Sequence, residues 1–441
     1  MLKIVKFGGS SLANATQFKK AIDIIRADET RRYVVPSAPG KRDSNDTKVT
    51  DMLLHAYEAG SQGKDITSNL EAIKARYQEI IDGLKMKDFS LDKDFEEIAN
   101  VYKNKSDFTQ DYMASRGEYL NGKIMAAYLG WEFVDSKDVI FFNEEGALNT
   151  YKTQKEMSTR LNAVEHAVIP GFYGLGKDGK IKTFSRGGSD ITGSIVTAAV
   201  KADVYENWTD VSGFMMTDPR IVKDSKSIHT ITYRELRELS YMGASVLHED
   251  AIFPIRSAGI PINIRNTNAP EDEGTWIVET TCQKPDFTIT GIAGKKGFCT
   301  VFITKSLMNA EVGFCRKVLT AFEENDICIE HMPSGIDTMT VVVHEDEFLH
   351  KEQQVVASIH RLAAPDTIEI DSGLALIAVV GRGMKSTRGT ASRAFTALAK
   401  NNINVRMIDQ GSSELNIIIG VDNSDFETAI KALYDEYVTM V

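Results

Sequence analysis

Two Gly-Gly-Ser stretches carry the residues of this sequence that are best suited to chemistry on phosphate groups. The first, "KFGGSS", ends a strand-like run of alternating apolar and basic residues and contains Lys6, Gly8, Gly9 and Ser10. Glycine lets the backbone approach a ligand closely, so we expect free N–H groups of Gly8 and Gly9 to cradle phosphate oxygens together with Ser10. The Lys6 ammonium would bring a point charge into the same space. The alternative is an ordinary strand-to-helix turn beside a solvated lysine, since the GxxxxGK[ST] phosphate-binding pattern is absent.

The second stretch, "TFSRGGSDITGS" (183–194), repeats the design of the first. Arg186 ends a strand-like run and offers a planar guanidinium suited to a carboxylate. Ser189 and Asp190 begin a helical run, and we expect the Asp190 carboxylate to lie near Lys6. Two such loops would clamp a polyphosphate from two sides.

A third candidate stretch, "ENWTDVSGFMMTDPRIV" (206–222), contains two Thr-Asp pairs after a strand-like run. We expect its polar residues to form loops at the same sheet edge, and the alternative is the ordinary turn chemistry of Asp and Pro. The residues concerned are Thr209, Asp210, Asp218 and Arg220.

The segment "ASRGEYLN" (114–121) places Glu118 in a helical run directly after Gly117. A glycine in a helix interior costs stability, so we expect Gly117 to pack closely against a ligand. The alternative is a solvated glutamate.

Alternating strand-like and helical runs up to about residue 280 must position these candidates. This alternation predicts an α/β fold with a mostly parallel sheet covered by helices on both faces. Three successive helical runs in 64–130 break the alternation and predict a helical insertion on one side of the sheet. The expected strands lie in 31–38, 163–174, 202–210 and 259–265, and the expected helices in 16–28, 46–59, 153–164, 188–200 and 249–257.

The polar stretch "ETTCQKPDFT" (279–288) predicts a domain boundary, beyond which the pattern favours short strands and two helices. An internal repeat follows this boundary. Residues 313–343 align without gaps with residues 389–419, and Gly313 corresponds to Gly389. Each copy reads helix, Asn turn, strand, Gly turn, strand, which predicts a duplicated α+β module.

Bulk properties exclude several classes of protein. A chain of 441 residues is too long for one core, and 42% hydrophobic and 26% charged residues are typical of globular proteins. A net charge of -11 without a basic block argues against nucleic acid and anionic membranes as partners. The sequence shows no membrane span and no signal peptide, so we expect a cytoplasmic location. The four cysteines predict reduced thiols in core positions, and scattered histidines predict no protein-held metal.

The motifs together, and in this order, resemble those of aspartate kinases, which are members of the amino-acid kinase family: "KFGGSS", "PSAPG", "SRGEYLN", "GFYG", "SRGGSD", "NWTDVSGFMMTDPR" and "MGASVLHEDAIFP". The duplicated module resembles a pair of ACT domains. The resemblance extends over nearly the whole chain and implies a catalytic amino-acid kinase domain followed by two α+β regulatory modules. No homoserine dehydrogenase domain is expected, so a monofunctional enzyme is implied. The implied domains are 1–285, 286–374 and 375–441, with 286–304 completing the second ACT-like module as in relatives.

The resemblance implies ATP-dependent phosphorylation of the β-carboxylate of L-aspartate to 4-phospho-L-aspartate, the first step towards lysine, threonine and methionine. Lys6 and Asp190 would be catalytic, and Mg²⁺ would arrive with ATP, held mainly by the phosphates. Ser245 stands where many relatives have a lysine and is not assigned a role. The implied ATP-binding residues are Lys6, Gly8, Gly9, Ser10, Thr209, Asp210, Asp218 and Arg220, and the implied aspartate-binding residues are Thr50, Glu118, Arg186 and Ser189.

ACT pairs bind amino acids at a dimer interface, so the resemblance also implies a homodimer or a dimer of dimers with an amino-acid effector. The stretch "HMPSGID" (331–337) resembles the lysine-sensitive branch. The implied regulatory residues are Met308, Gly313, Phe314, Glu330 and Ser334. Two alternatives stay open, namely a kinase of another acidic amino acid and a catalytically inactive amino-acid sensor.

Overall fold

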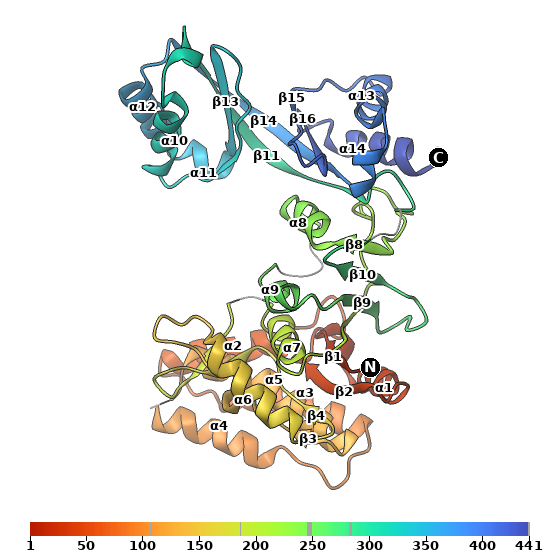
Figure 1. The fold of residues 1–441 in the computed structure, drawn as a ribbon. Coiled ribbons are helices and arrows are strands. Elements are labelled where there is room, and N and C mark those ends of the chain that lie inside the picture. The colour runs from red at the N-terminus through yellow and green to blue at the C-terminus, as the bar shows by residue number, and fades with distance from the viewer. Residues whose placement is uncertain (106, 186, 245–248, 282–284, 440–441) are drawn as a thin grey trace. The chain divides into compact units, whose positions relative to one another are not determined.

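The computed structural model describes residues 1–105, 107–185, 187–244, 249–281 and 285–439. The chain divides into two compact units (Figure 1). Among the described residues, the first unit takes in 1–214, 227–233 and 249–281, and the second takes in 215–226, 234–244 and 285–439.

The first unit is built on an eight-stranded sheet in the order β3-β4-β2-β1-β7-β9-β10-β8. The neighbours from β3 to β9 are all parallel, whereas β10 runs antiparallel to β9. Two further strands, β5 (Tyr173–Leu175) and β6 (Ile181–Thr183), form a separate hairpin. The strands of the large sheet are β1 (Lys3–Phe7), β2 (Arg31–Pro36), β3 (Glu132–Phe133), β4 (Ala167–Val168), β7 (Val204–Thr209), β8 (Thr230–Thr232), β9 (Ile262–Asn266) and β10 (Thr275–Val278).

Helices cover both faces of this sheet, and the alternation of side chains along β1 shows the two environments. Val5 and Phe7 are fully buried in a core that includes Phe18 of α1. Lys6 lies between them in sequence and therefore points to the opposite face, where α7 packs. The helices of this unit are α1 (Ala15–Arg26), α2 (Val49–Ser61), α3 (Thr67–Gly83), α4 (Asp92–Asn104), α5 (Gln110–Leu129), α6 (Thr150–Asn162), α7 (Gly188–Ala199) and α9 (Glu249–Ala258).

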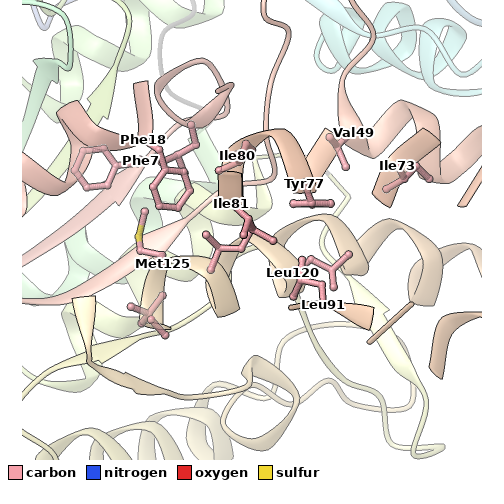
Figure 2. Packing of buried hydrophobic residues seen from close by; sticks show 14 of the residues in the cluster. Phe7, Phe18, Val49, Ile73, Tyr77, Ile80, Ile81, Leu91, Leu120 and Met125 are labelled. Carbon is pink, nitrogen blue, oxygen red and sulfur yellow. The ribbon is translucent and has the colours of Figure 1, made fainter. Parts of the chain in front are cut away.

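The core on the α1 face extends into the helical insertion formed by α3, α4 and α5. Figure 2 shows Ile73 and Tyr77 of α3 in the same buried cluster as Leu120 of α5 and Phe7 of β1. The insertion therefore shares one hydrophobic core with the central strand β1 and is not a separate appendage.

The predicted α/β class, the mostly parallel sheet and the helical insertion are confirmed. The strands β8 and β10 were not predicted. They have three and four residues respectively, and strands this short carry too little alternation to be recognised in sequence.

The second unit contains a six-stranded antiparallel sheet in the order β12-β13-β11-β14-β16-β15. Its central strands β11 (Gly291–Thr304) and β14 (Thr367–Val380) have 14 residues each, so the expectation of short strands is wrong. The expectation of two helices is also wrong. The remaining elements are β12 (Ile329–His331), β13 (Thr338–His344), β15 (Met407–Asp409), β16 (Asn416–Asp422), α10 (Phe314–Glu323), α11 (Glu345–Leu349), α12 (Glu352–Ala363), α13 (Thr390–Lys400) and α14 (Phe426–Tyr434), with α8 (Tyr233–Tyr241) entering from the first unit.

The strand length was missed because polar residues and glycines interrupt the pattern in the middle of β11. The pairing of β11 with β14 shifts register between Lys295 and Phe298, where the sequence reads "GKKG". A register shift of this kind keeps a strand continuous while breaking its hydrophobic alternation.

The internal repeat is confirmed by the structure of its two copies. Helices α10 and α13 both begin after a left-handed glycine, Gly313 at φ 85° and Gly389 at φ 83°. In Figure 1 the long strands β11 and β14 run between the group α10, α11 and α12 and the group α13 and α14. The first half of β11 pairs with β14 alone, and its second half also pairs with β13. Each long strand thus serves both copies.

The prediction that the cysteines occupy core positions is wrong in part. Cys299 is buried, but Cys315 and Cys328 are exposed, and Cys282 lies outside the described residues. Within the described ranges, no helix has both the length and the apolar character that crossing a membrane requires.

Candidate active site

Lys6 and Asp190 meet at the carboxyl end of β1, as the sequence predicted. The Lys6 Nζ atom lies 2.6 Å from Asp190 Oδ1, and their side chains are 9% and 19% exposed. Asn207, which pairs with Lys6 across the parallel strands β1 and β7, donates from Nδ2 to the same carboxylate oxygen over 2.8 Å. Sequence reasoning missed Asn207, although a lone buried amide inside an apolar strand is a usable signal.

The glycine loop after β1 differs from the prediction at Gly8. Its N–H group is not free, because it donates to the Trp208 carbonyl oxygen over 2.9 Å. A Cβ atom at Gly8 would lie 3.6 Å from the Trp208 carbonyl oxygen and 3.8 Å from Lys6 Nζ, which are ordinary contact distances, so the space around Gly8 does not require a glycine. No hydrogen bond within the described part of the chain uses the N–H groups of Gly9 or Ser10. These two groups, with the Lys6 ammonium, can receive phosphate oxygens.

Glu118 lies buried on α5 on the other side of this loop. Burial raises the pKa of its carboxyl group to about 7, while hydrogen bonds from the Ala38 N–H and the Ser189 hydroxyl and the charge of Lys6 act in the opposite direction. Its Oε2 atom has no hydrogen-bond partner among the described residues. A buried carboxylate oxygen without a partner is costly, so this atom is suited to receive a cationic group of a ligand.

The reason for Gly117 is different from the one predicted. A Cβ atom at this position would lie 2.8 Å from the Ala38 Cβ, 3.5 Å from a Leu53 methyl carbon and 3.7 Å from the Thr50 hydroxyl oxygen. The glycine therefore admits other parts of the protein and not a ligand. Its close packing brings Thr50, at the start of α2, next to Gly117, the residue before Glu118.

The second glycine stretch positions Ser189 at the start of α7. Gly187 has φ 58°, a left-handed conformation that favours glycine, and it precedes the first residue of the helix. Ser189 is buried and packs against Gly171, where a Cβ atom would lie 2.5 Å from the Ser189 hydroxyl oxygen. Arg186, the predicted carboxylate ligand, lies outside the described residues, as does Ser245.

The predicted nucleotide residues fall into two groups. Thr209 ends β7, and its hydroxyl donates to Asp210 over 3.1 Å. Asp218 and Arg220 belong to the second unit, where they form an ion pair of 2.6 Å that holds the pKa of Asp218 below its usual value. Arg220 is 88% exposed at its side chain.

Sequence reasoning also missed Ser11 and Thr267, which join the glycine loop to the end of β9. Their hydroxyl groups lie 2.8 Å apart in a buried hydrogen bond, and the Thr267 N–H donates to Thr209 O over 2.8 Å. Three strand ends are tied together in this way, and no local pattern predicts contacts between residues so distant in sequence.

The predicted regulatory residues differ widely in exposure. Met308 and Phe314 belong to the hydrophobic core beneath α10, whereas Gly313 and Ser334 are exposed. The Glu330 side chain is only 7% exposed, with its carboxylate 3.6 Å from His344 Nε2. It also accepts a hydrogen bond from Tyr241 of α8, and burial together with this hydrogen bond raises the pKa of that tyrosine.

Comparison with known proteins identifies the family and the fold. A profile of the amino acid kinase family matches residues 1–266, and a profile of the ACT domain matches residues 377–437. Aspartokinase 3 of Bacillus subtilis is 40% identical over 451 residues, which cover 99% of this chain and 98% of that protein. The crystal structure of the aspartate kinase of Clostridium acetobutylicum covers 99% of both chains with a TM-score of 0.89 and 49% identity. E. coli aspartokinase III, solved with aspartate and ADP, shares the fold over 99% of both chains with a TM-score of 0.73 and 23% identity.

The chain therefore belongs to the amino acid kinase family. Within that family it is an aspartokinase, a kinase that carries ACT-type modules after its catalytic domain.

Proposed function

We propose that this kinase transfers the γ-phosphoryl group of ATP to the β-carboxylate of L-aspartate and forms 4-phospho-L-aspartate, which feeds lysine, threonine and methionine synthesis. The observation that supports this most directly is the pairing of opposite charges in one site. The Lys6 ammonium lies beside the glycine loop, and the buried Glu118 carboxylate, one oxygen of which has no partner among the described residues, feels the charge of that ammonium. Such a site accepts an anion at one end and a cation at the other.

The phosphate end would be formed by Lys6, Gly9 and Ser10, with Gly8 connecting the strand that carries Lys6 to this loop. Asp190 and Asn207 orient the Lys6 ammonium, and Thr209 and Asp210 would face the nucleotide. We keep Asp218 and Arg220 as proposed nucleotide contacts on the sequence pattern alone. For aspartate, Glu118 suits the α-ammonium, Arg186 suits the α-carboxylate, and Thr50 and Ser189 lie beside Glu118.

The chemistry requires no general base, because the aspartate β-carboxylate is already ionised at pH 7. Its oxygen would attack the γ-phosphorus while the bond to the bridging oxygen of ADP breaks, and that oxygen leaves with the electron pair. The barrier is the approach of two anions, so positioning and positive charge carry the catalysis. Lys6 supplies that charge. Mg²⁺ would arrive with ATP and be held mainly by the phosphates and water.

The proposed substrate can be tested by measuring ATP turnover in parallel with L-aspartate, L-glutamate and N-acetyl-L-aspartate. We expect L-aspartate alone to be turned over efficiently. N-Acetyl-L-aspartate lacks the cation that Glu118 would bind, so its kcat/KM should be lower by at least about 100-fold. Preference for glutamate would assign the kinase to another acidic amino acid, and equal use of N-acetyl-L-aspartate would remove Glu118 from the substrate site.

We further propose that an end-product amino acid, lysine, inhibits the enzyme through the first copy of the duplicated module, in a cytoplasmic homodimer or dimer of dimers. The exposed Gly313 and Ser334 lie on the α10 start and the β12–β13 turn of that copy. The Glu330 carboxylate is a candidate partner for an effector ammonium. Glu330 also contacts Tyr241 of α8, so an effector that takes this carboxylate would alter a contact of the helix that enters from the first unit.

This regulation is tested by lysine titrations of the wild type, Glu330→Gln and Ser334→Ala at saturating ATP. Typical allosteric coupling is about 1–3 kcal/mol, so lysine should weaken aspartate binding by roughly 5- to 150-fold in the wild type. Both variants should keep their uninhibited activity and require more lysine for half-inhibition. Threonine, alone and with lysine, serves as the comparison effector. A wild type insensitive to lysine, or variants inhibited like the wild type, would contradict this effector site.

A further inference from the structure

The loop between β2 and α2, residues 37–48, lies directly against the glycine loop of the proposed phosphate site. The Gly40 N–H donates to the Gly9 carbonyl oxygen over 2.8 Å. A Cβ atom on Gly40 would lie 2.6 Å from the Gly9 carbonyl carbon, and one on Gly9 would lie 2.9 Å from Ala38 O. No side chain separates the two backbones. A displacement of Gly40 is therefore passed on to Gly9.

The same loop also reaches the proposed substrate end of the site. The Ala38 N–H donates to the Glu118 carboxylate, and the Ala38 methyl group packs against Gly117. Asn121, one turn further along α5, donates to the Ser37 carbonyl oxygen over 2.7 Å. The start of this loop thus touches both halves of the site.

Arg76 of α3 contacts this loop at two residues. Its side chain is 4% exposed, Nη2 donates to the Gly40 carbonyl oxygen over 2.9 Å, and the same atom forms an ion pair with Asp46 Oδ2, also at 2.9 Å. Gly40 and Asp46 lie on the two arms of the loop. One guanidinium group therefore joins both arms.

Tyr77, the next residue of α3, makes the corresponding contact with α5. It is fully buried, and its hydroxyl donates to the Gly117 carbonyl oxygen over 2.7 Å. Gly117 directly precedes Glu118. Arg76 thus binds the backbone at Gly40, next to the glycine loop, and Tyr77 binds the backbone at Gly117, next to Glu118.

Stability alone gives little reason for a buried charge at this place. Burial lowers the pKa of Arg76, and the neighbouring charge of Arg42 acts in the same direction. Replacing buried charges with apolar side chains is often neutral or stabilising. The other buried side chains of α3 are indeed largely apolar and include Leu70, Ile73, Ile80 and Ile81.

We propose that α3 braces the active site and that Arg76 and Tyr77 are positioning residues for phosphoryl transfer. Arg76 fixes the glycine loop through Gly40, and Tyr77 fixes Glu118 through Gly117. The inference rests on the roles proposed above for the glycine loop and Glu118.

The test compares steady-state kinetics of Arg76→Gln, Arg76→Lys and Tyr77→Phe at a temperature well below unfolding. A reacting group misplaced by about 1 Å can cost up to about 100-fold in rate. We expect Arg76→Gln to lower kcat by about 10- to 100-fold with the KM for aspartate within about 3-fold. Arg76→Lys, which can still donate to the Gly40 carbonyl, should recover a large part of kcat. Tyr77→Phe should instead raise the KM for aspartate by about 5- to 20-fold with little change in kcat.

Two control residues make similar contacts with other partners. Arg42 binds Asp46 from the more exposed side, with its side chain 39% exposed, and Tyr102 of α4 donates to the Lys64 carbonyl oxygen over 2.8 Å. Arg42→Gln and Tyr102→Phe remove comparable groups without touching Gly40 or Gly117. Both should stay within about 3-fold of the wild type in kcat and KM.

If Arg76→Gln and Tyr77→Phe are folded and have wild-type kinetics, the proposal that Arg76 and Tyr77 are positioning residues is contradicted. Losses that match the fraction of unfolded protein, or that the controls share, would overturn it as well. If Arg76→Gln does not fold, Arg76→Lys provides the test instead, because the proposal expects this variant to change kcat more than the KM for aspartate. Lys6→Ala in the same series separates the two proposals, because an active Lys6→Ala protein would contradict the site itself and not only its brace.

Discussion

Replacing Lys6 with alanine is expected to lower kcat by about 1000-fold or more while the protein stays folded. The Lys6 ammonium is the charged group that lies beside the glycine loop, and it would offset the negative charge that spreads over the transferring phosphoryl group. The KM values should change much less than kcat, because the interaction strengthens in the transition state. Steady-state kinetics with aspartate and ATP measure both parameters.

The fold should survive because the partner of Lys6 keeps a second donor. Asp190 still accepts the 2.8 Å hydrogen bond from Asn207, and its side chain is 19% exposed, so water can solvate the remaining charge. Circular dichroism and thermal unfolding check this point. Lys19→Ala, which removes an exposed lysine from α1, is the matched control and should leave kcat unchanged. Near-normal turnover by a folded Lys6→Ala protein would falsify the proposed mechanism.

Asp190→Asn is expected to show a smaller loss than Lys6→Ala. The asparagine keeps the shape of the side chain and removes only the charge that holds the ammonium in place. The two effects should not be additive in the double variant, because both act on the same group. Additive losses would mean that Asp190 acts separately from Lys6.

Local patterns were enough to predict the two charged residues that meet at the candidate site, Lys6 and Asp190. Lys6 and Asp190 were each recognisable from a strand that runs into a Gly-Gly-Ser turn, and a parallel sheet brings such turns to one edge. The groups that hold them in place were not recognisable in this way. Asn207 supports Lys6 from the neighbouring strand, and Thr267 reaches Ser11 from 256 residues away in sequence. These contacts depend on the order of the strands in the sheet, which no local stretch of sequence predicts.

The same limit explains the errors at the glycines. The sequence correctly indicated that Gly117 allows close approach, but it could not say what approaches, and a Cβ atom at Gly8 would meet only ordinary contacts of 3.6 Å and 3.8 Å. The Gly8 N–H is used by Trp208, and the space beside Gly117 is filled by Ala38 and Leu53. A glycine can indicate that there is no room for a side chain at its position, whereas the group that fills the space beside it depends on tertiary structure.

Replacing Glu118 with glutamine is expected to weaken aspartate binding by about 100-fold, since a neutral amide cannot pair with the α-ammonium of the substrate. The KM for aspartate should rise accordingly, with the KM for ATP nearly unchanged. Glu71→Gln, an exposed change on α3, is the matched control. An unchanged KM for aspartate would show that Glu118 does not contact the substrate.

Wild-type aspartate binding should also depend on pH, because the pKa of Glu118 is raised to about 7 by burial. The carboxylate form binds the ammonium, so the KM for aspartate should rise by about 5-fold as the pH falls from 7 to 6. In Glu118→Gln this part of the pH dependence should be absent. A pH profile that is the same in both proteins would assign the titration to another group.

The same substitution should stabilise the free protein, which separates loss of function from loss of structure. Glu118 has a folded-state pKa of about 7, above the usual 4.5. The folded protein therefore binds this proton more tightly than the unfolded chain does. The resulting stability is fully present below about pH 4.5 and is lost as the pH rises to about 7. Glutamine does not titrate, so the free energy of unfolding of Glu118→Gln should exceed that of the wild type by an amount that grows over this range, to on the order of 3 kcal/mol at pH 8. Urea unfolding of both proteins at pH 5 and pH 8 measures this difference. If the stability advantage of Glu118→Gln over the wild type were smaller at pH 8 than at pH 5, the raised pKa of the Glu118 carboxyl group would be contradicted.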